Sequence, residues 1–484
     1  MAEINSKGIS LKALVDKGNN RIIFAESNAD FVDVLFSLLT MPMGTVIRLT
    51  RNQPPTGEIG CMNNLYQSVE NLEVQCLHTE ACKTILLHPR NDAETHCRSL
   101  KLIIDDGEPI KYFVCSSYNF SACKFLSHYR TALCRCGRLM STEALLEVKE
   151  SKNLIPDGGV FAKEQAQFIV SEKLDVLPLS TAACLSSFSK LGVMDGSTIV
   201  ERTFNVGVDE VLNLLKCSLL SPAALTETLL KSKQFPQLGK ESFDQGMSIQ
   251  SQGEREASNS DRKICVKLIL SKSKKILCYA EAGEDFVNLI FSFLTVPLGH
   301  VVKKMNGSSS KGCINHLFKS ILDLDTEKSL KSDKHKELLI NPKLASGFGY
   351  ANQLLDIKEA SNQPNFFMPE VYFVDSLFIK EKYSSGSASL TVMDPRFHYY
   401  KEAKSGGGFV KGPAVFTITD SLVVAPLSSI SIISILDRLK VPFSDIEEKV
   451  VHVGNEEALR LLVASFVSES ALTNAFNLRV PKQE

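Results

Sequence analysis

A chain of 484 residues exceeds one ordinary domain of about 100–200 residues, so two to four domains are expected. Hydrophobic residues make up 44% of the chain and charged residues 23%, which are the proportions of a soluble globular protein and exclude disordered and fibrous classes. The 54 basic and 55 acidic residues give a net charge of −1, so the chain lacks the basic excess that duplex nucleic acid requires of its partners. We therefore expect no nucleic-acid ligand.

The sequence contains no recognisable export or membrane segment. Residues 1–15 include no apolar signal region, and no run of about 18 uncharged apolar residues occurs anywhere. The 13 cysteines are odd in number, so we expect reduced thiols or metal ligands rather than a disulfide framework. These features predict an intracellular protein, cytoplasmic or nuclear, without membrane contact.

The first predicted elements are a β-hairpin and a helix. Residues 9–26 contain the apolar runs ISLKALV and RIIFAES, separated by the turn residues DKGNN. Apolar residues then recur at helical spacing from Phe31 to Leu38, before Pro42 ends the helix. This hairpin–helix module occupies about residues 9–50.

A cysteine-rich insertion follows at residues 76–140. Four of its cysteines have the spacing C-x7-C-x10-C-x-C-G: Cys115, Cys123, Cys134 and Cys136. Four thiolates at about 2.3 Å would surround one tetrahedral zinc and stabilise the insertion, and Gly137 suits the turn after a ligand pair.

The spacing also leaves another interpretation open. A C-x-C pair departs from the usual C-x2–4-C knuckle, and His128 could replace one ligand. Four separate, reduced and partly buried thiols are the alternative to one structural zinc. In the second half, Asp375 stands where the first half has Cys115, so a metal site would belong to the first half alone.

The hairpin–helix plan recurs at about residues 165–235. The segment AQFIVSEKLDVLPLS predicts a hairpin with a tight turn, and a helix is expected at 181–191. The strand ERTFNVG follows, and helices are expected at 208–219 and 222–231.

A polar stretch rich in Ser, Gln and Gly, residues 236–262, predicts a flexible linker. It divides the chain into residues 1–235 and 263–484. In the second half the same pattern predicts modules at about 264–305 and 414–480.

The two halves align as divergent copies. Residues 9–46 match 264–301 without a gap, and the shared positions include Asp30-Phe31-Val32 with Asp285-Phe286-Val287. The motif Gly60-Cys61-x-Asn63-x-Leu65 likewise matches Gly312-Cys313-x-Asn315-x-Leu317. We interpret the chain as a tandem duplication of an α+β unit. For the unit itself we consider the β-grasp, or ubiquitin-like, plan and a generic α+β arrangement.

The paired blocks AESNADFVDVLFSLLTMPMG and AEAGEDFVNLIFSFLTVPLG, with GCMNNLYQSVENL, KTILLHPRN and ITDSLVVAPLSSIS, resemble the plant family of domain of unknown function 674 (DUF674). The resemblance covers essentially the whole chain. It implies a plant origin and a tandem architecture, and it brings no activity, substrate, cofactor or site residue.

Other candidate sites have simpler explanations. The cluster Cys76, His78, Cys82, His88, His96 and Cys97 fits no standard metal spacing. The glycine run 405–412 lacks the Lys and hydroxyl of a phosphate loop and is expected to be a connector. The shared acidic pairs Glu26/Glu281 and Asp30/Asp285 lie at a strand end and in a helix's first turn, where a carboxylate complements the helix dipole.

No catalytic constellation emerges from the sequence, so no catalytic residue is predicted. The leading hypothesis is a non-catalytic interaction or scaffold protein with a protein partner, in which two related units lie on a flexible joint. An enzyme with a site in the groove between the copies is one alternative. A zinc-stabilised regulatory protein is the other. The sequence leaves open the oligomeric state and whether the two halves pack together.

Overall fold

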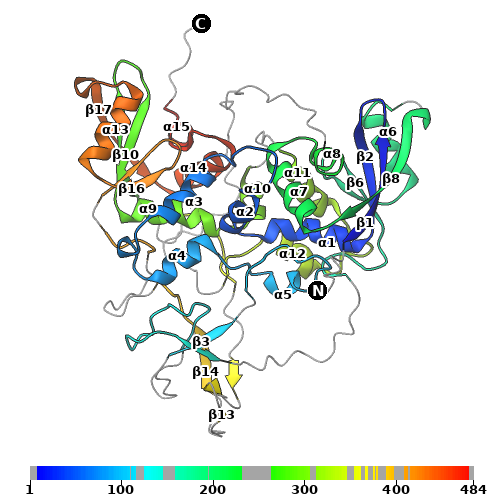
Figure 1. The fold of residues 1–484 in the computed structure, drawn as a ribbon, viewed down its shortest axis with the longest axis horizontal. Helices are drawn as coiled ribbons and strands as arrows, with labels where there is room; N and C mark the ends of the chain where they lie inside the picture. Colours follow the sequence, from blue (N-terminus) through cyan, green and yellow to red (C-terminus); the bar gives the residue numbers. More distant parts are fainter. Residues whose placement is uncertain are drawn as a thin grey trace, which may run out of the picture.

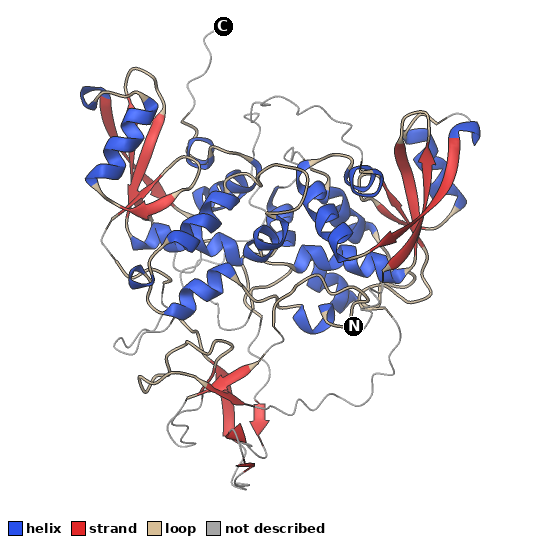
Figure 2. Cartoon of the chain, in the orientation of Figure 1, coloured by secondary structure: helices blue, strands red, loops and turns tan. Residues whose placement is uncertain are grey.

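The computed structural model describes residues 8–108, 111–115, 125–144, 159–193, 196–231, 263–305, 312–345, 354–360, 366–368, 374–375, 378–379, 388–396, 408–412 and 415–478. Two five-stranded sheets lie at opposite ends of the molecule, and helices fill the space between them (Figure 1, Figure 2). The predicted α+β class is therefore confirmed. The linker proposed at 236–262 lies outside the described residues.

The first sheet has the strand order β7-β6-β2-β1-β8, and all neighbouring strands are antiparallel. Ile9, Leu11 and Ala13 alternate with exposed or half-buried residues along β1, so one face of the sheet is buried against helices. The strands are β1 (Ile9–Asp16), β2 (Arg21–Ser27), β6 (Phe168–Ser171), β7 (Val176–Pro178) and β8 (Ile199–Val206).

The second sheet has the corresponding order, β16-β15-β10-β9-β17, and is also antiparallel. Its strands are β9 (Ile264–Ser271), β10 (Leu277–Ala282), β15 (Phe416–Ile418), β16 (Val424–Pro426) and β17 (Ile446–Val453). The predicted hairpins of both halves are confirmed. The β-grasp plan is not: it would insert the last strand parallel to the first, whereas β8 and β17 pair antiparallel with β1 and β9 at the sheet edge.

The helices begin where the sequence supplies caps. Ser180 accepts the N–H of Ala183 at 3.2 Å. In the two 13-residue helices, Glu210 accepts the N–H of Gly207 and Glu457 accepts the N–H of Gly454. The first half contains α1 (Ala29–Ser37), η1 (Leu38–Thr40), α2 (Met43–Thr50), α3 (Met62–Asn71), η2 (Val74–Cys76), α4 (Glu80–Leu87), α5 (Glu94–Cys97), α6 (Thr181–Lys190), η3 (Gly196–Thr198), α7 (Val208–Leu220) and α8 (Ala224–Leu230). The second half contains α9 (Glu284–Ser292), η4 (Phe293–Thr295), α10 (Leu298–Met305), α11 (Ile314–Asp323), α12 (Asp333–Ile340), α13 (Ser429–Leu439), η5 (Phe443–Asp445), α14 (Asn455–Val467) and α15 (Ala471–Ala475).

A third, smaller group of strands lies below the helices in Figure 2. β4 of the first half pairs in parallel with β14 of the second half, so both halves contribute to this small subdomain. The strands are β3 (Tyr112–Val114), β4 (Phe125–Leu126), β5 (Thr142–Ala144), β11 (Phe366–Met368), β12 (Val374–Asp375), β13 (Phe378–Ile379) and β14 (Ala388–Val392).

The two halves exchange helices. Ser68 on α3 accepts the N–H of Val424 in the second sheet at 2.9 Å, and Ser320 on α11 accepts the N–H of Val176 in the first sheet at 2.8 Å. Figure 1 shows α3 and α4 beside α9 and α14 of the second half, while α11 lies beside α7 of the first half. Each sheet is therefore covered in part by helices of the other half.

Between the two exchanged segments, the halves meet around Pro42 and Pro297. These prolines form a β-bridge, and the N–H of Met43 donates to Val296 while that of Leu298 donates to Met41, at 2.9 and 2.8 Å. One continuous cluster of buried apolar residues spans both halves. The halves therefore form one packed body, which answers the question that the sequence leaves open. None of the described helices is long and apolar enough to cross a membrane.

Candidate metal centre

The cysteine-rich segment places its thiols at two points of the small subdomain. Cys115 directly follows β3, and Cys134 and Cys136 lie in a tight hairpin turn. The N–H of Gly137 donates to the carbonyl of Cys134 at 2.8 Å, and Gly137 has a φ of +82°, a backbone conformation that glycine adopts without strain. The turn thereby presents two cysteines to the strand that carries the third.

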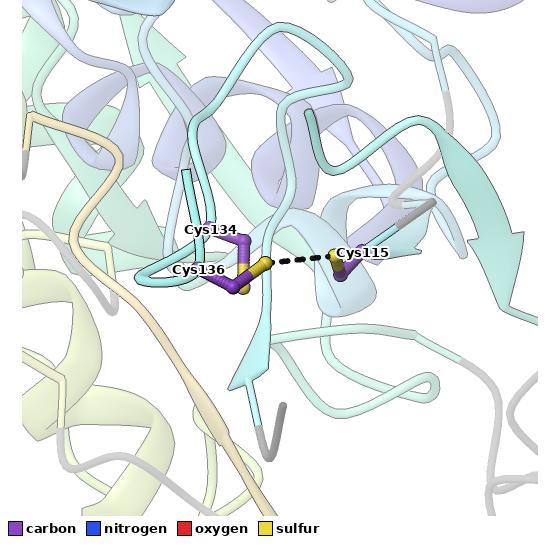
Figure 3. A group of neighbouring side chains, drawn as sticks. All are labelled: Cys115, Cys134 and Cys136. Carbon is purple, nitrogen blue, oxygen red and sulfur yellow. Dashed lines mark hydrogen bonds between the residues drawn. The ribbon is translucent and has the colours of Figure 1, made fainter. Parts of the chain in front are cut away.

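The three sulfur atoms lie within 4.8 Å of one another, and the Sγ atoms of Cys115 and Cys136 are 3.3 Å apart (Figure 3). In a tetrahedral zinc site with Zn–S bonds of about 2.3 Å, neighbouring sulfurs are about 3.8 Å apart. The observed spacing brackets that value. These residues thus fit three ligands of a zinc ion, and small side-chain adjustments would complete the geometry.

The cysteines differ in exposure. Cys115 and Cys134 are each 1% exposed, whereas Cys136 is exposed to solvent. A bound zinc would therefore be buried on one side and reach solvent through Cys136.

Two predicted alternatives for the fourth ligand have different outcomes. Cys123 lies outside the described residues. His128 is described and does not join the group of sulfurs. Its ring instead packs at a tilt against Tyr112, with centroids 4.8 Å apart and an angle of 48° between the planes, and burial lowers its pKa to about 4. His128 is therefore a neutral packing residue beside the site.

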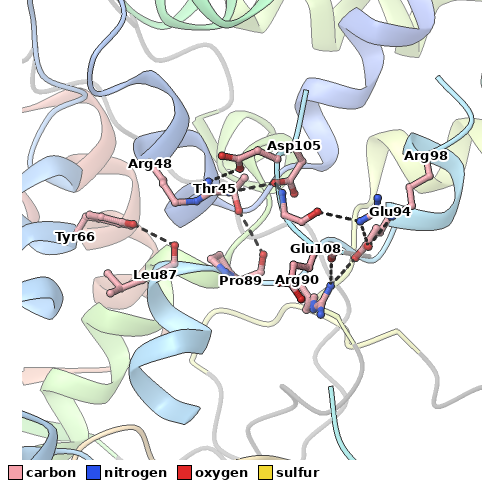
Figure 4. Close-up of polar contacts among 12 residues, drawn as sticks. Thr45, Arg48, Tyr66, Leu87, Pro89, Arg90, Glu94, Arg98, Asp105 and Glu108 are labelled. Atoms are coloured by element: carbon pink, nitrogen blue, oxygen red, sulfur yellow. Dashed lines mark hydrogen bonds and ion pairs between the residues drawn. The ribbon is translucent and has the colours of Figure 1, made fainter. Parts of the chain in front are cut away.

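The segment between α5 and β3, residues 98–108 and here called the strap, connects the metal subdomain to the helical body. The sequence analysis did not predict the residues that hold it. Arg48 on α2 forms ion pairs with Asp105, at 3.1 Å, and Asp106, so it anchors the chain ahead of β3 (Figure 4). Its side chain is only 13% exposed. This burial reduces screening of the two ion pairs by solvent.

The strap is also held by the carboxylate of Glu94 on α5. Glu94 accepts hydrogen bonds from Arg90 and Arg98, at 3.2 and 2.8 Å. The same two arginines donate to the carbonyls of Glu108 and Gly107 (Figure 4). Mixed charges in residues 90–108 are the sequence signal that could have indicated this strap, but the pairing depends on the fold.

The family model described as a protein of unknown function (DUF674) matches residues 5–456. The chain belongs to this family. The resemblance to DUF674 found in the sequence is thereby confirmed. No match was found among curated proteins or among solved structures.

The remaining cysteine and histidine candidates of this DUF674 member do not form a metal site among the described residues. Cys82 contacts Thr79 at 3.2 Å, and Cys97 contacts Thr40 at 3.8 Å, within the core. His96 stacks on His335 of α12, and burial lowers the pKa of both rings.

The shared acidic residues and the glycine run also have structural roles. Asp30 and Asp285 lie in the first turns of α1 and α9, as predicted. Within the described part of the glycine run, the N–H of Gly412 donates to Glu284 at 2.6 Å. Glu26 and Glu281 lie next to the ends of β2 and β10, as predicted, and Glu281 pairs across the sheet with Lys267 on β9.

A pocket of about 490 Å³ opens between the halves of this DUF674 protein. Asn91 and Asp92 line it from the first half, and Asp333, Glu337 and Lys343 line it from the second. Burial raises the pKa of Asp92, and the positive charge of Lys343 opposes that rise. The pocket has the volume of a small-molecule site and places titratable groups from both halves together.

Proposed function

We propose that this protein is a non-catalytic interaction protein that binds a protein partner through two equivalent end faces. An end face is here the outer surface of one five-stranded sheet with the helix that covers it, α6 or α13. Leu185 on α6 and Ile433 on α13 occupy corresponding positions, and they are 60% and 53% exposed. Ile430, also on α13, adds further exposed apolar surface to the second end face, at 79%.

Each end face also carries a corresponding ion pair. Lys12 lies 3.7 Å from Glu201 on the first sheet, and Lys267 lies 3.3 Å from Glu448 on the second. Solvent screens such exposed pairs, so they supply a polar surround for the apolar residues rather than a stabilising contact. An apolar centre with a polar rim is the usual composition of a protein interface.

The exchanged helices support a bivalent function. Because the halves share one core, the two end faces are held at a fixed separation. Binding at one face then places the second face at a defined position relative to a repeated or dimeric partner. Fixed geometry of this kind raises avidity by about 10²–10⁴ when both sites reach the same partner.

Site-specific photo-crosslinking tests this proposal. A photoreactive residue at Leu185 and another at Ile433 should capture the same partner, and one at Leu322, an exposed apolar residue on α11 rather than on α6, α13 or a strand, should not. Leu185→Asp with Ile433→Asp should abolish capture by the intact protein, while Leu322→Asp leaves it unchanged. Different partners at the two positions, or equal capture at Leu322, would contradict the proposal.

A zinc bound by Cys115, Cys134 and Cys136 would give the small subdomain a structural role in this scaffold. The support is the grouping of the three sulfurs within 4.8 Å. A site with three or four thiolates stabilises the segment that supplies its ligands. Native mass spectrometry of protein prepared without added metal should detect one zinc per chain, and Cys134→Ser should remove it.

The pocket between the halves favours a second candidate, an enzyme or binding protein for a small charged metabolite. Its support is the convergence of Asp92 and Lys343 at the junction of the halves. A metabolite that raises the melting temperature of the wild type, with the shift lost in Asp92→Asn and retained in Asp209→Asn, would favour this candidate. Asp209 lies on α7, away from the pocket lining.

For the cellular setting we propose an intracellular protein without a nucleic-acid or membrane partner. The near-neutral net charge of −1 supports the first exclusion. Retention on heparin at physiological salt would argue against it.

A further inference from the structure

The exposure of Cys136 sets it apart from the other two sulfurs of the metal centre. Cys115 and Cys134 are buried, so a solvent-borne reagent reaches the cluster through Cys136. The inference below rests on the structural zinc proposed above and extends it.

Cys136 lies in a basic stretch of the hairpin turn. Arg135 and Arg138 lie on either side of it in the sequence. The Arg135 guanidinium lies 4.4 Å from the centre of the Phe125 ring, which fixes a positive charge in the subdomain. Partial exposure and nearby positive charge are the conditions under which cysteines become reactive.

A second thiol lies within reach. The Sγ atom of Cys115 is 3.3 Å from that of Cys136, and a disulfide has an S–S length of about 2.05 Å, so a movement of about 1.3 Å joins them. Cys115 is at the end of β3 and Cys136 is in the hairpin turn, so the turn can close this gap without disrupting either main sheet.

We propose that Cys136 is an oxidation site for hydroperoxides, and that its oxidation releases the zinc by forming a Cys115–Cys136 disulfide. The Cys136 thiolate attacks one oxygen of hydrogen peroxide, which gives a sulfenic acid and hydroxide. The Cys115 thiolate then attacks the Cys136 sulfur, the S–S bond forms, and a second hydroxide leaves. The two thiolates together lose two electrons, the peroxide is reduced to two hydroxides, and the zinc leaves as a hydrated ion.

The consequence for the molecule is local. A disulfide removes two of the three described sulfur ligands, so the remaining thiolate cannot retain the ion. The subdomain then stays attached to the helical body through the strap held by Arg48, and the pairing of β4 with β14 still joins its two chain segments. Peroxide would therefore loosen the small subdomain and leave the two end faces in place.

The experiment uses full-length, zinc-loaded protein whose zinc content is first measured by native mass spectrometry. Hydrogen peroxide is then added in steps, zinc release is followed with a chromogenic chelator, and disulfides are mapped by alkylation and peptide mass spectrometry. Cys265 is the matched control, because it is an exposed cysteine on β9 outside the cluster. Cys265→Ser should release zinc as the wild type does, and the disulfide that forms during release should join Cys115 to Cys136 in both proteins.

Labelling of sulfenic acid in the zinc-loaded wild type identifies the cysteine that reacts first with peroxide. At less than one equivalent of peroxide, the label should appear on Cys136 before Cys265. Absence of zinc at the start would overturn the metal centre itself. Bound zinc that stays in place while Cys265 becomes oxidised, or release with a different disulfide, would overturn the peroxide inference alone.

Discussion

Buried polar side chains hold equivalent loops in the two halves. The carboxylate of Asp33, 1% exposed, accepts the N–H groups of Phe161 and Ala162 at 2.9 and 2.7 Å. Asn288 occupies the corresponding position and its carbonyl oxygen accepts two successive N–H groups of residues 409–410, at 2.7 and 3.0 Å. The two halves thus hold the same loop through a side-chain oxygen, which belongs to a carboxyl group in Asp33 and to an uncharged amide in Asn288.

This difference predicts a dependence of stability on pH. Burial raises the pKa of Asp33 above its ordinary value of 3.8, despite the N–H groups that it accepts. A raised pKa in the folded state means that the stabilising contribution is complete below pH 3.8 and is lost as the pH rises through the folded pKa. Asp33→Asn should therefore gain stability relative to the wild type between pH 4 and the folded pKa of Asp33.

Urea denaturation at successive pH values measures this effect, with Asn288→Asp as the reciprocal variant. Asn288→Asp should add a second carboxyl group of this kind, so the variant should lose more stability than the wild type as the pH rises. If the difference between wild type and Asp33→Asn is independent of pH, the folded pKa of Asp33 is not raised.

The sequence predicted some of the candidate metal residues and missed what supports them. Cys115, Cys134 and Cys136 were recognisable because cysteines at short spacing are a local signal. The strap from Arg48 to Asp105 joins residues that are distant in sequence, and charged residues at such separations are usually independent surface positions. Only the folded chain brings them together.

At the scale of elements, local patterns predicted the two sheets well. Alternating apolar residues and the turn DKGNN predicted β1 and β2, and the helix predicted at 181–191 is α6. The sequence pattern does not indicate the exchange of helices, because α3 has the same apolar face whichever half it covers. Hydrophobic periodicity predicts which face of a helix is buried but does not predict which element packs against that face.

The junction of each exchanged segment depends on a glycine. Gly60 has a φ of +53°, and a Cβ atom there would lie 2.4 Å from the carbonyl oxygen of Ser465 in the other half. A Cβ atom at Gly312 would lie 2.2 Å from the carbonyl oxygen of Ser218. The backbones approach closely because the N–H groups of the next residues, Cys61 and Cys313, donate to these same carbonyls.

Alanine at either glycine should therefore separate the exchanged segment from the opposite half. We expect Gly60→Ala and Gly312→Ala each to lower the free energy of unfolding by about 1–3 kcal/mol, through a forced backbone shift and a weakened hydrogen bond. Gly196→Ala is the control, since no atom lies within 4 Å of its added Cβ. Thermal unfolding measures all three, and equal melting temperatures would show that these junctions tolerate a side chain.

At the scale of the whole molecule, the exchange makes each half incomplete without the other. The first sheet lacks the α11 contact when residues 263–484 are absent, and the second lacks the α3 contact when residues 1–235 are absent. Apolar surface that is buried in the shared core would then be exposed to water, at a free-energy cost of about 25 cal/mol per Å². The sequence predicted two units and could not predict this dependence.

The corresponding prediction is that the halves complement each other as separate chains. Residues 1–235 and 263–484, expressed together, should form a soluble one-to-one complex. Apart from the linker, only non-covalent contacts such as those of Ser68 and Ser320 hold the halves together, and these contacts do not need a continuous chain. Either half alone should aggregate or pair with a second copy of itself by exchanging the same helices. Size-exclusion chromatography with light scattering distinguishes these states. Two stable monomers that do not associate would mean that each sheet completes its own core, and the fixed separation of the end faces would no longer hold.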